Sequence, residues 1–124
     1  MTSNPSLRIL LIEESKDLQE ITKIGINLSI DATVDFVRSI ADAIAYLNEP
    51  LPDLIFLGFE HHSIKTLEMI HQALVRPVPV IVLMNQTRLS DQLKIQRYGA
   101  KAILSYTFEP VQLRQLLYEL TSSH

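Results

Sequence analysis

The sequence predicts an α/β fold in which a parallel β-sheet is covered by helices on both faces. Short, continuous apolar runs occur at intervals along the chain, and such runs are typical of strands that are buried on both faces. Between them lie segments in which apolar residues recur every three or four positions, as they do along one side of a helix. The two kinds of segment alternate five times, which is the pattern of repeated βα units.

Five segments have the composition of buried strands. They are predicted over residues 7–12, 32–37, 54–57, 80–84 and 101–104. The third of these organises the prediction, because Pro52-Asp53 leads into it and Gly58 ends it. In an open α/β sheet, ligands and reactive groups lie at the carboxyl ends of the strands. The residues directly after each strand are therefore the first place to look for a site.

Five amphipathic segments follow the strands. Helices are predicted over residues 18–28, 39–48, 64–74, 90–98 and 111–120. Ser15 is placed to cap the first helix, Gly99 to end the fourth, and Pro110 to begin the last. We expect the first helix to pack through its apolar stripe, which consists of Leu18, Ile21, Ile24 and Leu28.

Length and composition restrict the class of protein. A chain of 124 residues that is 47% hydrophobic and 20% charged is expected to form one globular domain over residues 1–124. Its net charge of −3 gives no general attraction to nucleic acid or to an anionic membrane. The absence of cysteine excludes disulfides and thiolate metal sites and fits a cytoplasmic protein. The N-terminus has no signal-peptide pattern, and the apolar runs are too short to span a membrane.

Together these segments resemble the receiver domain of bacterial two-component response regulators. The resemblance covers residues 7–120 and rests on four features. These are Glu13-Glu14 after the first strand, Pro52-Asp53 before the third, Pro79 before the fourth, and Gly99-Ala100 with Phe108-Glu109-Pro110 before the last helix. It implies a flavodoxin-like (βα)5 three-layer sandwich with strand order 2-1-3-4-5.

The resemblance also implies a phosphoryl-transfer site. In a working receiver, an aspartate at the end of the third strand accepts a phosphoryl group, and two acids after the first strand help to hold Mg²⁺. A serine or threonine after the fourth strand and a lysine after the fifth bind the phosphoryl oxygens. Nucleophile, metal and cation are all needed, because the transferred group carries dispersed negative charge.

At the matching positions this sequence has other residues. Gly58 stands for the acceptor aspartate, Met84 for the hydroxyl residue, Tyr106 for the lysine, Thr107 for the proline after it, and Ile103 for the aromatic residue of the fifth strand. The acidic pair is retained as Glu13 and Glu14. We therefore predict a degenerate form, or pseudo-receiver, that is not an enzyme, needs no cofactor and acts by phosphorylation-independent protein–protein interaction.

Two alternatives follow from the same residues. One is an atypical phospho-switch with a non-standard acceptor. The other is a small-ligand sensor at the carboxyl edge of the sheet, in a pocket vacated by Gly58 and lined by Glu13, Glu14, Met84 and Tyr106. Glu13 and Glu14 are also the candidates for residual Mg²⁺ binding, although Mg²⁺ demands a tight octahedral set of oxygens.

Three further expectations concern loops. Tyr106 is expected either to hydrogen-bond to Glu13 or Glu14 or to cover the pocket. The Tyr106–Thr107 peptide bond is expected to be trans, because a cis bond before a residue other than proline costs about 3–4 kcal/mol. Glu60-His61-His62 offers metal-ligand types, but adjacent loop residues rarely converge on one ion, so we expect exposed histidines.

A partner surface is predicted on the fourth helix, the fifth strand and the last helix, the region through which receivers commonly meet partners. Basic residues and tyrosines, which suit interfaces, gather in these segments. They are Arg88, Lys94, Arg97, Tyr98, Lys101, Gln112, Arg114 and Tyr118. We expect a protein partner in a signalling pathway, or self-association through this surface, with no direct nucleic-acid partner and no membrane.

Overall fold

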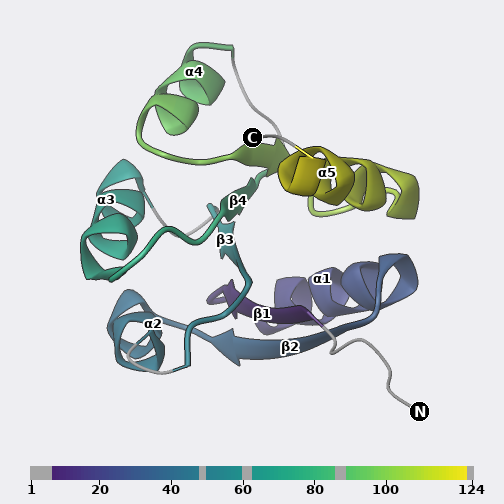
Figure 1. Ribbon diagram of the computed structural model, residues 1–124, viewed down its shortest axis with the longest axis horizontal. Coiled ribbons are helices and arrows are strands. Elements are labelled where there is room, and N and C mark those ends of the chain that lie inside the picture. The colour runs from purple at the N-terminus through teal and green to yellow at the C-terminus, as the bar shows by residue number, and fades with distance from the viewer. Residues whose placement is uncertain (1–6, 48–49, 60–62, 86–88, 123–124) are drawn as a thin grey trace.

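The computed structural model describes residues 7–47, 50–59, 63–85 and 89–122. It contains one parallel five-stranded sheet in the order β2-β1-β3-β4-β5 (Figure 1). The strands are β1 (Leu7–Ile12), β2 (Ala32–Val37), β3 (Leu54–Gly58), β4 (Val80–Leu83) and β5 (Ala102–Leu104). The helices are α1 (Lys16–Ser29), α2 (Ile40–Tyr46), α3 (Ile64–Ala73), α4 (Leu89–Arg97) and α5 (Pro110–Ser122). The predicted fold class and strand order are confirmed.

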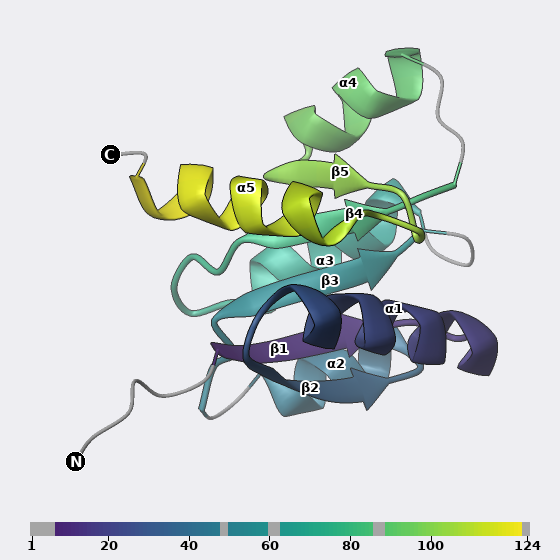
Figure 2. The same ribbon diagram turned by 90° about the vertical axis from the view of Figure 1, so that its right-hand side faces the viewer.

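The sheet is the middle of three layers. Helices α2, α3 and α4 lie on one side of it, and α1 and α5 lie together on the other (Figure 2). Alternate residues of each strand point to opposite faces, so each strand supplies both cores. In β1, Leu10 and Ile12 belong to the core under α2 and α3, whereas Ile9 and Leu11 belong to the core under α1 and α5.

Helix ends follow local chemistry closely. The Ser15 side chain accepts a hydrogen bond from the Leu18 backbone N–H at 3.3 Å, as expected for an N-cap. Gly99 follows α4 with a φ of +111°, a left-handed conformation that favours glycine. A Cβ built on Gly99 would also lie 2.6 Å from Cε1 of His71, so both conformation and space require glycine there.

The predicted packing face of α1 is wrong. Ile21, Ile24 and Leu28 are 45%, 57% and 69% exposed. The buried face consists instead of Gln19, Thr22, Ile26 and Ser29.

Two of the inward polar residues of α1 are satisfied by backbone carbonyls, whereas the buried Thr22 hydroxyl has no hydrogen-bond partner among the described residues. The Gln19 amide donates to the Glu13 carbonyl at 2.6 Å, and the Ser29 hydroxyl donates to the Gly25 carbonyl at 2.6 Å. Gly25 lets the Phe108 ring approach closely, since a Cβ there would lie 3.1 Å from Phe108 Cζ. Helical spacing identified the stripes of α1 but not which stripe packs inward.

Some element boundaries differ by one or two residues from those predicted. Helix α4 begins at Leu89 rather than at Ser90 or Asp91, and β5 begins at Ala102 rather than Lys101. Within the four described ranges, no helix combines the length and the apolar character needed to cross a bilayer.

Candidate functional site

The carboxyl edge of the sheet holds a buried carboxylate directly after β1. Glu13 has no exposed surface, and its backbone N–H donates to the Val37 carbonyl at 3.0 Å. Its Oε1 accepts a hydrogen bond from the Tyr106 hydroxyl at 2.6 Å, and its Oε2 accepts one from the Ser15 backbone N–H at 2.8 Å. Both oxygens are therefore bound inside the protein, as a buried acid requires.

Gly58 is the last residue of β3 and lies beneath this carboxylate. A Cβ built on Gly58 would overlap Oε1 of Glu13 and would lie 2.5 Å from the Tyr106 hydroxyl and 2.8 Å from Glu13 Cδ. The absence of a side chain at Gly58 therefore has a direct structural consequence. It makes the room in which the Glu13 carboxylate lies.

Tyr106 closes the same space from the loop that follows β5. Its side chain is only 2% exposed, and its hydroxyl donates to Glu13, one of the two partners expected from the sequence. The pocket predicted to be vacated by Gly58 is therefore filled by Glu13 and Tyr106. Glu14 is exposed and lies outside this buried cluster.

The other predicted pocket residues lie to one side. Met84 is half-buried and lines a hollow of about 230 Å³ together with Asn85, Gln92, Ile103, Leu104 and Ser105. Thr107 is exposed, and its hydroxyl lies 3.1 Å from that of Ser105. The structure therefore brings together Glu13, Gly58 and Tyr106 and leaves Met84 and Thr107 at the rim. The trans Tyr106–Thr107 peptide bond stays a prediction.

The geometry of Glu13 also bears on metal binding. Its two oxygens face the Tyr106 hydroxyl and the Ser15 N–H, and no group of three or more histidine or acidic side chains with metal-site geometry occurs in the described ranges. The Glu60-His61-His62 segment lies outside the described residues.

The predicted partner surface is exposed where the structure describes it, and Arg88 lies outside the described residues. Tyr98 and Tyr118 are 40% and 68% exposed. Arg114 is exposed as well, and its Nη1 also donates to the Ser29 carbonyl at 3.2 Å, which ties α5 to α1.

Sequence reasoning missed the apolar part of this surface. Leu89 and Leu93 on α4 are 71% and 56% exposed, and Val111 on α5 is 62% exposed. Helix α4 buries a single residue, Ile95, among those described. The signal was available in the spacing of Leu89 and Leu93, which are four positions apart and so share one side of the helix.

A second polar cluster, also missed, joins β1, β2 and α2. The Tyr46 hydroxyl donates to Asp35 Oδ2 and accepts a hydrogen bond from Arg8 Nη2 at 3.1 Å. Arg8 Nη1 donates in turn to the Leu51 carbonyl at 2.9 Å. Burial and the hydrogen bond to Asp35 raise the pKa of Tyr46, with Arg8 opposing them. The cluster lies away from the carboxyl edge of the sheet. Through Arg8 it binds the Leu51 carbonyl, in the segment after α2, to β1.

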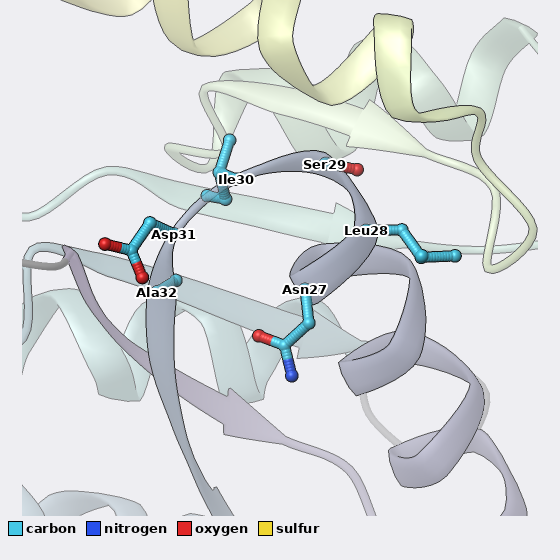
Figure 3. A pocket seen from close by; sticks show the side chains of 6 residues that line it. All are labelled: Asn27, Leu28, Ser29, Ile30, Asp31 and Ala32. Carbon is cyan, nitrogen blue, oxygen red and sulfur yellow. The ribbon is translucent and has the colours of Figure 1, made fainter.

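Another hollow, of about 590 Å³, lies where α1 turns into β2 (Figure 3). It is lined by Asn27, Leu28, Ser29, Ile30, Asp31 and Ala32. The side chains of Asp31 and Leu28 point in opposite directions from this turn, as the figure shows. It therefore brings no reactive groups together.

Comparison with known proteins gives a match at the level of the fold. The sequence matches no family model and no curated protein. The structure is similar to a response regulator from Thermotoga maritima, with 16% identity, 96% of this chain and 100% of that chain covered, and a TM-score of 0.80. The fold is that of a response-regulator receiver domain.

Two further solved structures show the same likeness. One is a two-component response regulator of the LuxR family from Aurantimonas sp. SI85-9A1, with 16% identity, coverage of 97% and 88%, and a TM-score of 0.79. The other is the phosphorylated cyanobacterial phytochrome response regulator RcpA, with 24% identity, coverage of 96% of both chains and a TM-score of 0.66. At these low sequence identities, the structural similarity shows the receiver fold alone. Any argument about function therefore has to rest on the site.

Proposed function

We propose that this chain is a pseudo-receiver, a signalling module that keeps the receiver fold and acts by phosphorylation-independent protein–protein interaction. The observation that carries the proposal is the buried Glu13 carboxylate, which lies where a side chain on residue 58 would begin. Gly58, at the position expected for the acceptor, has no carboxylate of its own. The space beside it, filled by Glu13 and Tyr106, leaves no room for a phosphoryl group.

The remaining groups support the same conclusion. Asp53 lies at the opposite end of β3, where its Oδ2 accepts a hydrogen bond from the Arg8 backbone N–H at 2.8 Å. Tyr106 supplies a hydroxyl where a receiver has a cationic ammonium, so this position contributes no positive charge to stabilise a transferred phosphoryl group. Since both oxygens of Glu13 accept protein hydrogen bonds, we propose that the module works without Mg²⁺ or another cofactor.

The filled pocket argues against the small-ligand alternative at the same place. A ligand beside Gly58 would have to displace the Glu13 carboxylate and the Tyr106 ring, which are 0% and 2% exposed. That displacement would break the hydrogen bond between them and leave a buried acid without its partners.

The proposed interaction surface consists of exposed residues of α4, of the turn between α4 and β5, and of α5. It combines exposed leucines with basic and aromatic side chains, and Arg and Tyr are enriched at protein interfaces. It comprises Leu89, Leu93, Lys94, Arg97, Tyr98, Lys101 and Tyr118. We propose a protein partner with an acidic margin, or a second copy of the chain, in a single cytoplasmic receiver-like domain that contacts neither nucleic acid nor membrane directly.

The phosphorylation test uses the full chain, Mg²⁺ and acetyl phosphate, followed by intact-mass measurement. A receiver that has the acceptor aspartate, treated in parallel, shows that the donor is active. We expect no added phosphoryl group on this chain. A stoichiometric gain of one phosphoryl group would refute the proposal and favour the atypical switch, and locating it would identify the acceptor.

The surface test compares two variants with equal chemistry on different faces. Leu93→Glu changes the proposed surface, and Leu28→Glu changes another exposed leucine, on α1, which is 69% exposed against 56% for Leu93. We expect Leu93→Glu to lose partner binding, or the self-association measured by sedimentation. The wild type and Leu28→Glu should both retain it. Loss with Leu28→Glu alone would place the interaction elsewhere.

A further inference from the structure

We propose that the Glu13–Tyr106 hydrogen bond is a permanent latch that holds the loop between β5 and α5, and with it the α4–β5–α5 surface, in one conformation. The proposal rests on the proposed function in one respect, namely that this surface is the one that meets partners. It goes further in naming what sets the state of that surface.

The Glu13–Tyr106 hydrogen bond joins residues that are far apart both in the chain and in the sheet. Glu13 follows β1 and Tyr106 follows β5, and the two residues are 93 positions apart in the chain. Strands β3 and β4 lie between β1 and β5 in the sheet. The tyrosine side chain therefore reaches back over the end of β3, above Gly58, and ties an edge loop to the centre of the molecule.

The Glu13 acceptor is also held in place by groups other than the tyrosine. The Ser15 backbone N–H fixes Oε2 of Glu13 at 2.8 Å, and the Gln19 amide fixes the Glu13 carbonyl at 2.6 Å. A hydrogen bond to a fixed, buried and charged acceptor is shorter and stronger than one between neutral exposed groups. The contact therefore persists without any covalent modification.

The Phe108 ring packs against α1 and Tyr106 joins the loop between β5 and α5 to Glu13, whereas the loop's own hydrogen bonds are internal. The Thr107 N–H donates to the Ser105 hydroxyl at 3.1 Å, and the Phe108 N–H donates to the Ser105 carbonyl at 3.2 Å. These bonds shape the turn, but they do not join it to the sheet. Tyr106, in the middle of this turn, is buried and provides a link to the sheet.

The loop between β5 and α5 also lies beside α4. Ser105, the neighbour of Tyr106, lines the 230 Å³ hollow together with Gln92 of α4. Helix α4 and the loop therefore line the same hollow, and we expect its shape to change once the loop is released. The latch is what keeps that space in one shape.

The test removes only the hydroxyl, with Tyr106→Phe in the full chain. We expect amide hydrogen exchange over residues 104–109 and the first turn of α5 to rise about 10- to 100-fold, the factor that corresponds to losing one hydrogen bond to a charged group. Tyr118→Phe removes an exposed hydroxyl from the neighbouring helix and should leave these rates unchanged.

Two further measurements keep the inference falsifiable. Glu13→Gln keeps an oxygen that can accept from Tyr106, so it should retain more of the protection than Glu13→Ala. Methyl NMR signals of Leu89 and Leu93 should shift in Tyr106→Phe and stay fixed in Tyr118→Phe. Unchanged exchange over 104–109 would refute the latch, and unchanged methyl signals would refute its link to the surface.

These measurements need neither phosphodonor nor partner. A phosphoryl group on the wild type would overturn the proposed function without touching the exchange result. Conversely, unchanged exchange in Tyr106→Phe would remove the latch and leave the phosphorylation-independent interaction standing.

Discussion

The substitution Gly58→Ala adds a single methyl group at the place where the site is most crowded. That Cβ would overlap Oε1 of Glu13 and would lie 2.5 Å from the Tyr106 hydroxyl. The terminal carboxylate can move more easily than the strand, so we expect Glu13 to leave the pocket. Its departure breaks the hydrogen bonds from Tyr106 and from the Ser15 N–H.

The expected cost follows from these two bonds. Each hydrogen bond to a charged group contributes about 1.5–3 kcal/mol, and a displaced carboxylate recovers part of this by solvation. We therefore expect the free energy of unfolding to fall by about 2–4 kcal/mol. At roughly 3–5 °C per kcal/mol for a chain of this size, the melting midpoint should fall by roughly 6–20 °C.

Urea unfolding followed by circular dichroism measures this change, with an unchanged slope showing that the two-state behaviour is intact. Gly25→Ala is the matched control. Its new Cβ would lie 3.1 Å from Phe108, but alanine also has a higher helix propensity than glycine, so we expect little net change in stability. In a Glu13→Ala background, Gly58→Ala should cost less than in the wild type, because the nearest clashing group, Oε1 of Glu13, has gone and the Tyr106 hydroxyl, 2.5 Å from the new Cβ, has space to move. A stabilising or neutral Gly58→Ala in the wild type, as expected for an ordinary strand glycine, would refute the reasoning.

Three other predictions test the fold. Ile26→Ala, which truncates a buried side chain, should lower the free energy of unfolding by about 2–5 kcal/mol, whereas Ile24→Ala should lower it by less than about 0.5 kcal/mol. Equal losses in urea unfolding would show that the buried face of α1 is misassigned. Gly99→Ala should destabilise by more than about 1 kcal/mol, because it combines a positive φ with a clash against His71, and a neutral result would contradict that conformation. The pKa of Tyr46 is raised in the folded state, so its contribution to stability is complete below the unfolded pKa and is lost as pH rises through the folded one. Stability measured from pH 8 upward should therefore fall less steeply above about pH 10 in Tyr46→Phe than in the wild type, and parallel curves would exclude Tyr46 as the cause.

The layout of strands and helices could be predicted because buried parallel strands leave a strong signal. The run 54–57 is apolar without interruption, and in the structure β3 pairs with β1 on one side and β4 on the other. A strand in that position has no solvent face, so every residue along it is apolar. Strand order itself came from the resemblance and not from this periodicity.

The packing of α1 could not be predicted from periodicity alone. Its apolar residues Ile21, Ile24 and Leu28 are regularly spaced, yet the sheet side is taken by Thr22 and Ile26. Which side packs depends on contacts remote in sequence, such as the approach of the Phe108 ring to the helix backbone. A single-sequence reading has no access to such contacts.

The candidate site shows a similar division. The resemblance placed Gly58 and Tyr106 where an aspartate and a lysine are expected, and the sequence offered Glu13 as one partner for Tyr106. It did not reveal that Glu13 enters the space above Gly58, because that depends on side-chain length. A glutamate has one methylene more than an aspartate, and this extra reach brings its carboxylate over the end of β3.

The three positions are therefore best understood as one physical unit. Glu13 can occupy the pocket only if residue 58 lacks a Cβ, and Tyr106 can reach the carboxylate only because it lies there. Each of the three residues therefore supplies a packing partner, or the space for one, to the other two. It follows that restoring an aspartate at residue 58 alone would place two carboxylates in a space that holds one, so the acceptor geometry could return only if Glu13 were shortened in the same chain.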